Sequence, residues 1–248
     1  MLEGWTVIRW ICAAAAGLFV GFAKTGLPGS GMPAIALMAE AFRSDVRLSV
    51  GAMLPVLLVG DLFAVFFYRR HTQWRRLREL FPFVAVGMIP GYLVLWLSSS
   101  QSLKLLLGAL ILTLLSVHVV SRLVGKDWLA RRPGFGGVAG LLAGFGTAVG
   151  NAAGPIMTIY LLSRRLEKQE FMGTVAWFFF IVNLSKIPFF GGMGILTPQT
   201  LLAGMVAIPM VVVGALLGAG VLKRLPQTVF EVLVLIFAGL AGLRLLLS

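Results

Sequence analysis

The chain has 248 residues, of which 59% are hydrophobic and only 12% are charged, and its mean hydropathy is +0.97. A soluble domain is closer to half apolar and a quarter charged, so this composition excludes a soluble domain and indicates an all-α polytopic membrane protein. The net charge is +12. Its basic residues form short clusters between apolar runs, which is typical of cytoplasmic loops and argues against a nucleic-acid partner.

The sequence contains one cysteine and two histidines. An intrachain disulfide and a thiolate metal cluster are therefore excluded, and we expect no metal and no cofactor. The motifs of zinc proteases, P-loop proteins and serine hydrolases are also missing from the sequence. We therefore expect that the protein is not an enzyme.

The first apolar stretch, Val7–Phe42, is interrupted by glycines and small polar residues between Gly21 and Gly31. Inside a membrane, backbone that leaves a helix has unpaired N–H and C=O groups, which protein or a polar cavity must satisfy. We predict a broken helix that restarts near Met32, with Pro33 in the first turn of the new helix.

Three apolar runs follow this first broken segment, and a second broken segment is followed by three more. Each run has about 16–22 residues, which is long enough to cross a bilayer. The first three runs are Leu48–Tyr68, Leu80–Leu97 and Leu105–Val120. The second broken segment is Gly134–Leu162, interrupted between Gly144 and Gly154, with a helix predicted to restart at Pro155. The last three runs are Phe171–Phe190, Leu201–Leu222 and Val229–Leu243.

The two halves of the chain align as repeats of four elements, residues 1–125 and residues 126–248. Gly21 and Gly31 fall on Gly144 and Gly154. The other aligned pairs include Asp61 with Asn183, Pro82 with Pro209, Gly87 with Gly214, and Gly91 with Gly218. We interpret this correspondence as an internal duplication.

The distribution of lysine and arginine over the loops bears on topology. If every element crosses the membrane, the basic residues divide almost evenly between the two sides. If both broken segments enter and leave on one face, most basic loops lie inside, and the repeats become inverted in topology. For the first segment, the charge count does not distinguish crossing from re-entry, because Val7–Ala23 is almost long enough to cross. Repeat symmetry with the second segment is what favours re-entry there.

The start of a helix inside the membrane offers free N–H groups and a positive dipole end, which together suit an anion. Ser30 and Asn151 are natural caps or ligand donors, and Lys24 stands where charge is expensive. The residues that we expect to bind a substrate are Lys24, Thr25, Ser30 and Gly31 with Thr147, Asn151 and Gly154. The alternatives are that the breaks are packing kinks and that Lys24 extends to the membrane surface.

Asp61 lies in the middle of an apolar run, which makes it a candidate for coupling transport to protons or charge. We expect it to pair with Lys24 or with Lys186, which follows Asn183 by one helical turn. Asp61, Asn183 and Lys186 are therefore the predicted coupling residues, although Lys186 could equally extend to the surface. His118 is expected to be an ordinary interfacial histidine.

At the segments Gly21–Pro33 and Gly140–Tyr160 the chain resembles the TauE/SafE sulfite exporter family of membrane transporters (TSUP). The resemblance covers nearly the whole chain and includes the layout of four plus four elements. It implies a multi-pass transporter of the bacterial inner membrane whose substrates are sulfite, sulfonates or related sulfur compounds. It also implies that the two breaks line the substrate path.

These observations predict a secondary transporter for a small anion, most simply sulfite or an organosulfonate, with the lipid bilayer as its surroundings. An anion channel and a membrane assembly partner that transports nothing are the alternatives. Glycine-lined helix faces also permit a homodimer.

Overall fold

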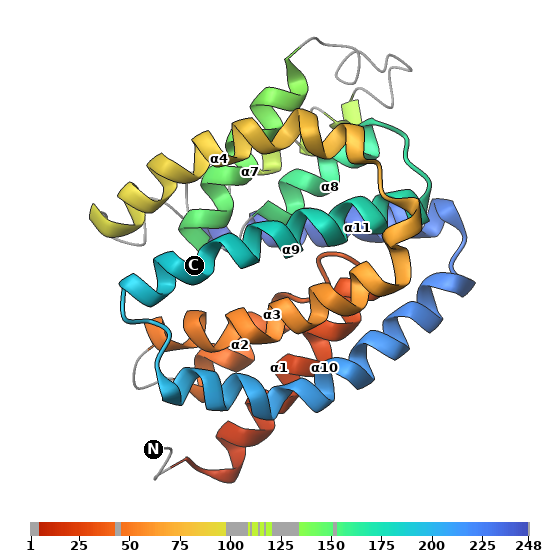
Figure 1. Ribbon diagram of the computed structural model, residues 1–248. Coiled ribbons are helices and arrows are strands. Elements are labelled where there is room, and N and C mark those ends of the chain that lie inside the picture. The colour runs from red at the N-terminus through yellow and green to blue at the C-terminus, as the bar shows by residue number, and fades with distance from the viewer. Residues whose placement is uncertain are drawn as a thin grey trace. The chain divides into compact units, whose positions relative to one another are not determined.

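The computed structural model describes residues 5–42, 46–97, 134–150 and 153–247, with residues 109, 111–113, 115–116 and 118–120. These residues form helices, turns and short connections, and no strand occurs among them. Figure 1 shows the helices with their labels. The predicted all-α fold is confirmed.

The chain forms two compact units, and each unit takes helices from both halves of the sequence. Unit 1 comprises Met1–Thr72 and Met172–Pro226, and unit 2 comprises Gln73–Phe171 and Gln227–Ser248. Unit 1 holds α1 (Val7–Thr25), α2 (Met32–Ala41), α3 (Val46–Tyr68), η1 (Arg69–His71), most of α9 (Lys168–Gly192) and α10 (Pro198–Arg224). Unit 2 holds α4 (Trp74–Leu97), α7 (Phe135–Gly150), α8 (Ala153–Ser163) and α11 (Gln227–Leu247).

The break in the first segment exists, but it is shorter than predicted. The first helix continues through Gly21 to Thr25, and the helix after the break begins at Met32 as predicted. In the second half α7 continues through Gly144 to Gly150, and α8 is described from Ala153, before the predicted Pro155. Residues 151 and 152, where the predicted break falls, lie outside the described residues. A glycine inside a helix costs only about 1 kcal/mol relative to alanine, so a glycine alone does not end a helix that packs well.

The predicted spans correspond closely to the long helices. Among the described residues, six helices are long and apolar enough to cross a membrane, and the protein is a multi-pass membrane protein. They are Val7–Thr25, Leu48–His71, Trp74–Val94, Lys168–Gly192, Pro198–Arg224 and Gln227–Arg244. The predicted run Leu105–Val120 lies partly outside the described residues. The helix α1 is thus long enough to cross, whereas Phe135–Ala148 and Ala153–Ser163 are shorter; re-entry of the broken segments stays a prediction.

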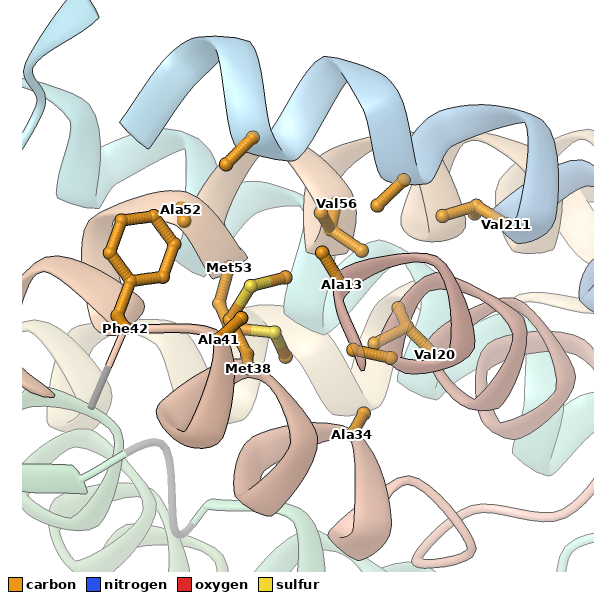
Figure 2. Close-up of a cluster of buried hydrophobic side chains, with 13 residues drawn as sticks. Ala13, Val20, Ala34, Met38, Ala41, Phe42, Ala52, Met53, Val56 and Val211 are labelled. Atoms are coloured by element: carbon orange, nitrogen blue, oxygen red, sulfur yellow. The ribbon is translucent and has the colours of Figure 1, made fainter. Parts of the chain in front are cut away.

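The core of unit 1 lies where α1, α2, α3 and α10 meet, and Figure 2 shows its side chains. Alanines dominate this core, with Val20, Met38, Val56 and Val211 filling the space between them. Lipid tails are as apolar as these side chains, so the hydrophobic effect does not drive the helices together. Close packing of small residues has to supply the attraction instead.

The tightest packing in each unit joins the first helix of a broken segment to a helix from the other half of the chain. In unit 1, α1 lies along α10, and in unit 2, α7 lies along α4 (Figure 1). At Gly21 and Gly214 an added Cβ would collide with the backbone carbonyls of Val211 and Leu18. Glycine is required at both positions because backbone lies against backbone.

The glycine contacts of unit 1 recur in unit 2 at aligned positions. An added Cβ at Gly144 would collide with the Val84 carbonyl, and one at Gly87 with the Leu141 carbonyl. Gly144 and Gly87 are the aligned partners of Gly21 and Gly214, and Val84 and Val211 each stand two residues after an aligned proline. This correspondence supports the duplication that we propose for residues 1–125 and 126–248.

Two glycines of α10 provide a matched test of this packing. Gly214→Ala should lower stability by about 1–3 kcal/mol or more, because its methyl group would overlap the Leu18 carbonyl. Gly220→Ala should leave stability unchanged or slightly higher, since nothing lies within 4 Å of an added Cβ there. Thermal melting of the purified protein in detergent, followed by tryptophan fluorescence, measures both effects. Equal melting temperatures for the two variants would contradict the packing described above.

Candidate functional site

A buried carboxylate forms the centre of the candidate site. Asp61 lies in the middle of α3, and its side chain is fully buried. The Lys24 Nζ lies 2.6 Å from Asp61 Oδ1, and the Asn183 Nδ2 donates a hydrogen bond of 2.7 Å to Oδ2. The carboxylate thus has an ion pair at Oδ1 and a hydrogen bond at Oδ2, and the predicted pairing of Asp61 with Lys24 is present in the structure.

A second lysine is connected to this carboxylate by hydrogen bonds of the Asn183 side-chain amide. Lys186 Nζ donates a hydrogen bond of 3.1 Å to Asn183 Oδ1. The amide thus presents its NH₂ group to the carboxylate of Asp61 and its oxygen to the ammonium, which determines its orientation. Lys186 is only 1% exposed, so the alternative that it extends to the membrane surface is wrong. We call Lys24, Asp61, Asn183 and Lys186 the charged cluster.

The Lys24 side chain reaches Asp61 because α1 and α3 approach closely at Gly60. An added Cβ at Gly60 would lie 3.1 Å from Lys24 Cγ, so a larger residue would press on the lysine stem. The Lys24 ammonium also lies 4.3 Å from the centre of the Phe179 ring. A cation over an aromatic face is stabilised electrostatically. Residues of α1, α3 and α9 together hold this ammonium in place.

The end of α1, directly after Lys24, is fixed by hydrogen bonds to two other helices. The Thr25 hydroxyl lies 2.7 Å from the Ala215 carbonyl oxygen of α10 and 3.1 Å from that of Gly21. The Tyr68 hydroxyl donates a hydrogen bond of 2.5 Å to the Thr25 carbonyl. That carbonyl is one of those at a helix end with no partner in the helix, so Tyr68 satisfies it. The hydrogen bonds of Thr25 thus help to position Lys24, independently of any contact of Thr25 with a substrate.

The turn of the first break is compact and ends at the start of α2. The Ser30 hydroxyl donates a hydrogen bond of 2.7 Å to the Leu27 carbonyl, and Gly29 has a φ of +94°. That conformation is strained for other residues and natural for glycine. Gly31 is the N-cap of α2, and no side chain caps this end of the helix by a hydrogen bond. Because glycine has no side chain, the N-cap residue offers no acceptor to the first N–H groups of α2.

The predicted residues of the second break belong to unit 2, whereas the charged cluster belongs to unit 1. Thr147 is buried near the end of α7, and its hydroxyl has no hydrogen-bond partner among the described residues. Gly154 lies in the first turn of α8. Asn151 lies outside the described residues.

Several partners in and around the site could not be found from the sequence. His118, which the sequence predicts to be an ordinary interfacial histidine, is buried between helices, and its Nδ1 lies 3.0 Å from Ser163 Oγ. The partners of the Lys24 region, Tyr68 and Phe179, are far from it along the chain and carry no motif. Phe179 stands in a run of aromatic residues, a pattern that fits a lipid-facing side chain as well as a packed one.

The charged cluster contains two ammonium groups and one carboxylate. With all three ionised, Lys24, Asp61 and Lys186 have a sum of charges of +1. Among the described residues, Asp61 is the one carboxylate that is buried. No group of three His, Cys, Asp or Glu side chains that could hold a metal occurs in the described part of the chain. A buried excess of positive charge is suited to an anion, which would neutralise it.

Comparison with known proteins gives one match. The model of a protein family described as Sulfite exporter TauE/SafE matches residues 13–245, which is nearly the whole chain. No curated protein and no solved structure matches the chain. All four residues of the charged cluster lie inside the matched region.

A double-mutant cycle tests the ion pair between Lys24 and Asp61. Lys24→Met removes the closest charge from a fully buried carboxylate and should therefore destabilise the protein. In the background of Asp61→Asn the same change should cost less, with a coupling of about 0.5–3 kcal/mol. Unfolding of the purified protein by titration with a denaturing detergent measures the free energies, and Lys223→Met on the exposed end of α10 is the control. Additive effects of the two substitutions would show that the pair is not energetically coupled.

Proposed function

We propose that this chain, which belongs to the TauE/SafE sulfite exporter family, is a secondary transporter that moves a small sulfur oxyanion across the membrane. Sulfite and organosulfonates are the proposed substrates. In bacteria a multi-pass transporter of this family belongs to the plasma membrane. The proposal concerns the substrate, the residues that bind it and the way its movement is coupled.

The observation that supports the proposal is that two lysines and one carboxylate lie together in the buried charged cluster, whose charges sum to +1 when all three groups are ionised. Removing an ion from water costs several kcal/mol even after the protein relaxes, so a lasting uncompensated charge is unfavourable. Ionisable residues inside membrane spans are therefore rare and commonly belong to substrate or ion pathways. A bound monoanion would bring the sum of charges at Lys24, Asp61 and Lys186 to zero.

The first break supplies further donors next to the cluster along the chain. Lys24 stands in the last turn of α1, which ends at Thr25, and α2 begins at Met32 after a turn that contains Ser30 and Gly31. The N–H groups at the start of α2 carry partial positive charge and are suited to an oxyanion. We propose that Lys24, Thr25, Ser30 and Gly31 contact the substrate, as the family resemblance implies.

The second break is proposed to take part in the same path. Gly154, the aligned partner of Gly31, lies in the first described turn of α8 and is followed by Pro155, as Gly31 is followed closely by Pro33. The buried hydroxyl of Thr147 is suited to an oxyanion oxygen, since it has no partner among the described residues. Asn151 completes this proposed set. In transporters with two repeats, broken helices commonly hold the substrate while the access alternates between the two sides.

Coupling is proposed to involve Asp61, Asn183 and Lys186. The Lys24 ammonium lies beside Oδ1 of the Asp61 carboxylate. The Asn183 amide donates a hydrogen bond to Oδ2 and accepts one from the Lys186 ammonium. A substrate anion that binds one ammonium competes with this carboxylate for it. Binding of the substrate would therefore alter the contacts that join α1, α3 and α9, which is the type of change that moves helices.

The test is uptake of sulfite or an organosulfonate into liposomes that contain the purified protein. Lys186→Met should reduce the initial rate at low substrate concentration by about tenfold or more, because a charged hydrogen bond contributes about 1.5–3 kcal/mol. Lys223→Met, at the exposed end of α10, should leave the rate unchanged. Both variants lose one lysine, so a difference between them cannot arise from net charge alone.

The same assay separates a carrier from an anion channel. A carrier should give flux that saturates with substrate concentration, and flux that follows an imposed pH gradient would indicate proton coupling. Equal flux for Lys186→Met and the unmodified protein would reject the assignment of the charged cluster to the substrate. No flux of any sulfur oxyanion would reject the transporter proposal itself.

A further inference from the structure

The first turn of α7 carries backbone N–H donors that the transport proposal does not use. This helix begins at Phe135 and has 16 residues, and its first turn contains Gly136 and Gly137. Gly134, directly before it, has a φ of +89°. The first N–H groups of a helix have no partner inside the helix, and they carry the positive end of its dipole. Neither glycine has a side chain to cover this turn, and an added Cβ on Gly136 would meet its neighbours only at ordinary contact distance.

A buried hydroxyl faces this turn. Tyr160 of α8 is fully buried, and its hydroxyl has no hydrogen-bond partner among the described residues. An added Cβ on Gly136 would lie 3.6 Å from the Tyr160 Oη, so the hydroxyl points at the backbone of the first turn of α7. A buried hydroxyl is normally hydrogen-bonded, which indicates that a ligand or a water completes this site.

A guanidinium group lies beside the same backbone. The added Cβ on Gly136 would lie 3.9 Å from an Arg164 guanidinium nitrogen. The Arg164 guanidinium is 5.2 Å from the centre of the Tyr160 ring and 5.9 Å from that of Phe135. Stacking on two rings orients the planar guanidinium, and Arg164 is partly exposed at the edge of the site. A ligand could therefore enter past Arg164.

We propose that the first turn of α7, the Tyr160 hydroxyl and the Arg164 guanidinium bind a phosphate-type oxyanion. A phosphoryl group has several acceptor oxygens, which can receive hydrogen bonds from the backbone N–H groups, from the phenol and from the guanidinium together. The source of the phosphate is a lipid headgroup or free inorganic phosphate. This phosphate site lies in unit 2 and contains no residue of the charged cluster.

The experiment measures the melting temperature of the purified full-length protein in detergent as a phosphate probe is added. One arm uses inorganic phosphate against chloride at equal ionic strength. The other uses dioleoylphosphatidylglycerol against dioleoylglycerol, which lacks the phosphate. At least one probe should raise the melting temperature saturably and give an apparent Kd. A response in the first arm alone identifies free phosphate, and one in the second arm alone identifies a lipid headgroup.

The variants assign the response to the proposed residues. Tyr160→Phe, Arg164→Met and Gly136→Ala should each raise the apparent Kd by about tenfold or more, because each removes or covers a donor to a charged oxyanion. Arg165→Met, at the next position, should bind like the unmodified protein. Gly136→Ala adds a methyl group at ordinary contact distance from its neighbours, so it should fold normally.

Three results would overturn the proposal. The first is a melting temperature that neither probe raises beyond its control. The second is unaltered binding by Tyr160→Phe. The third is a Tyr160→Phe variant that melts well below the unmodified protein without any probe, because the hydroxyl would then have a partner within the fold. Removal of a buried hydroxyl that lacks a partner should instead leave the melting temperature equal or higher.

Discussion

A carboxylate in the middle of a membrane-spanning helix must be neutralised nearby, and this requirement determines how α1, α3 and α9 meet. The Lys24 ammonium can lie 2.6 Å from Asp61 only if the end of α1 comes within reach of the middle of α3. Gly60 allows the lysine stem to approach, and Tyr68 and Thr25 fix the end of α1. The pairing of Lys24 with Asp61 thus accounts both for where α1 ends and for the burial of a carboxylate in the middle of α3.

The position of α1 depends in turn on glycines of α10, which comes from the other half of the chain. In lipid, helices associate through close contact of small residues and not through the hydrophobic effect. The contacts of Gly21 and Gly214 satisfy this requirement in unit 1, and those of Gly144 and Gly87 do so in unit 2. Since each unit combines helices from both halves, neither half contains the full set of packing partners for its own broken segment.

The sequence predicted the features that depend on local composition. Long apolar runs marked the spans, and Met32 with Pro33 marked the restart of a helix after the first break. The ion pair of Asp61 with Lys24 was one of two predicted pairings, because so few charges occur within the spans. In these cases the cost of polar groups in lipid leaves few alternatives.

The features that the sequence did not reveal depend on contacts between distant segments. The glycine pattern predicts that the breaks start at Gly21 and Gly144, whereas each of these glycines allows its helix to continue against another helix. The burial of His118 beside Ser163 depends on where α8 ends, which no local pattern records. Helix packing decides such partners, and a periodicity or a motif contains no information about the helix that lies opposite.

Under the proposed function, the charge of the cluster also bears on which anions are transported. One negative charge brings Lys24, Asp61 and Lys186 to neutrality, whereas a dianion would leave an excess negative charge in a site where an ion loses its hydration. A sulfonate group carries a single charge at neutral pH, and sulfite is partly a monoanion there. Sulfate is a dianion under the same conditions. The presence of a second lysine beside an ion pair that is already neutral therefore favours sulfonates and hydrogen sulfite over sulfate, through charge and not through the shape of the oxyanion.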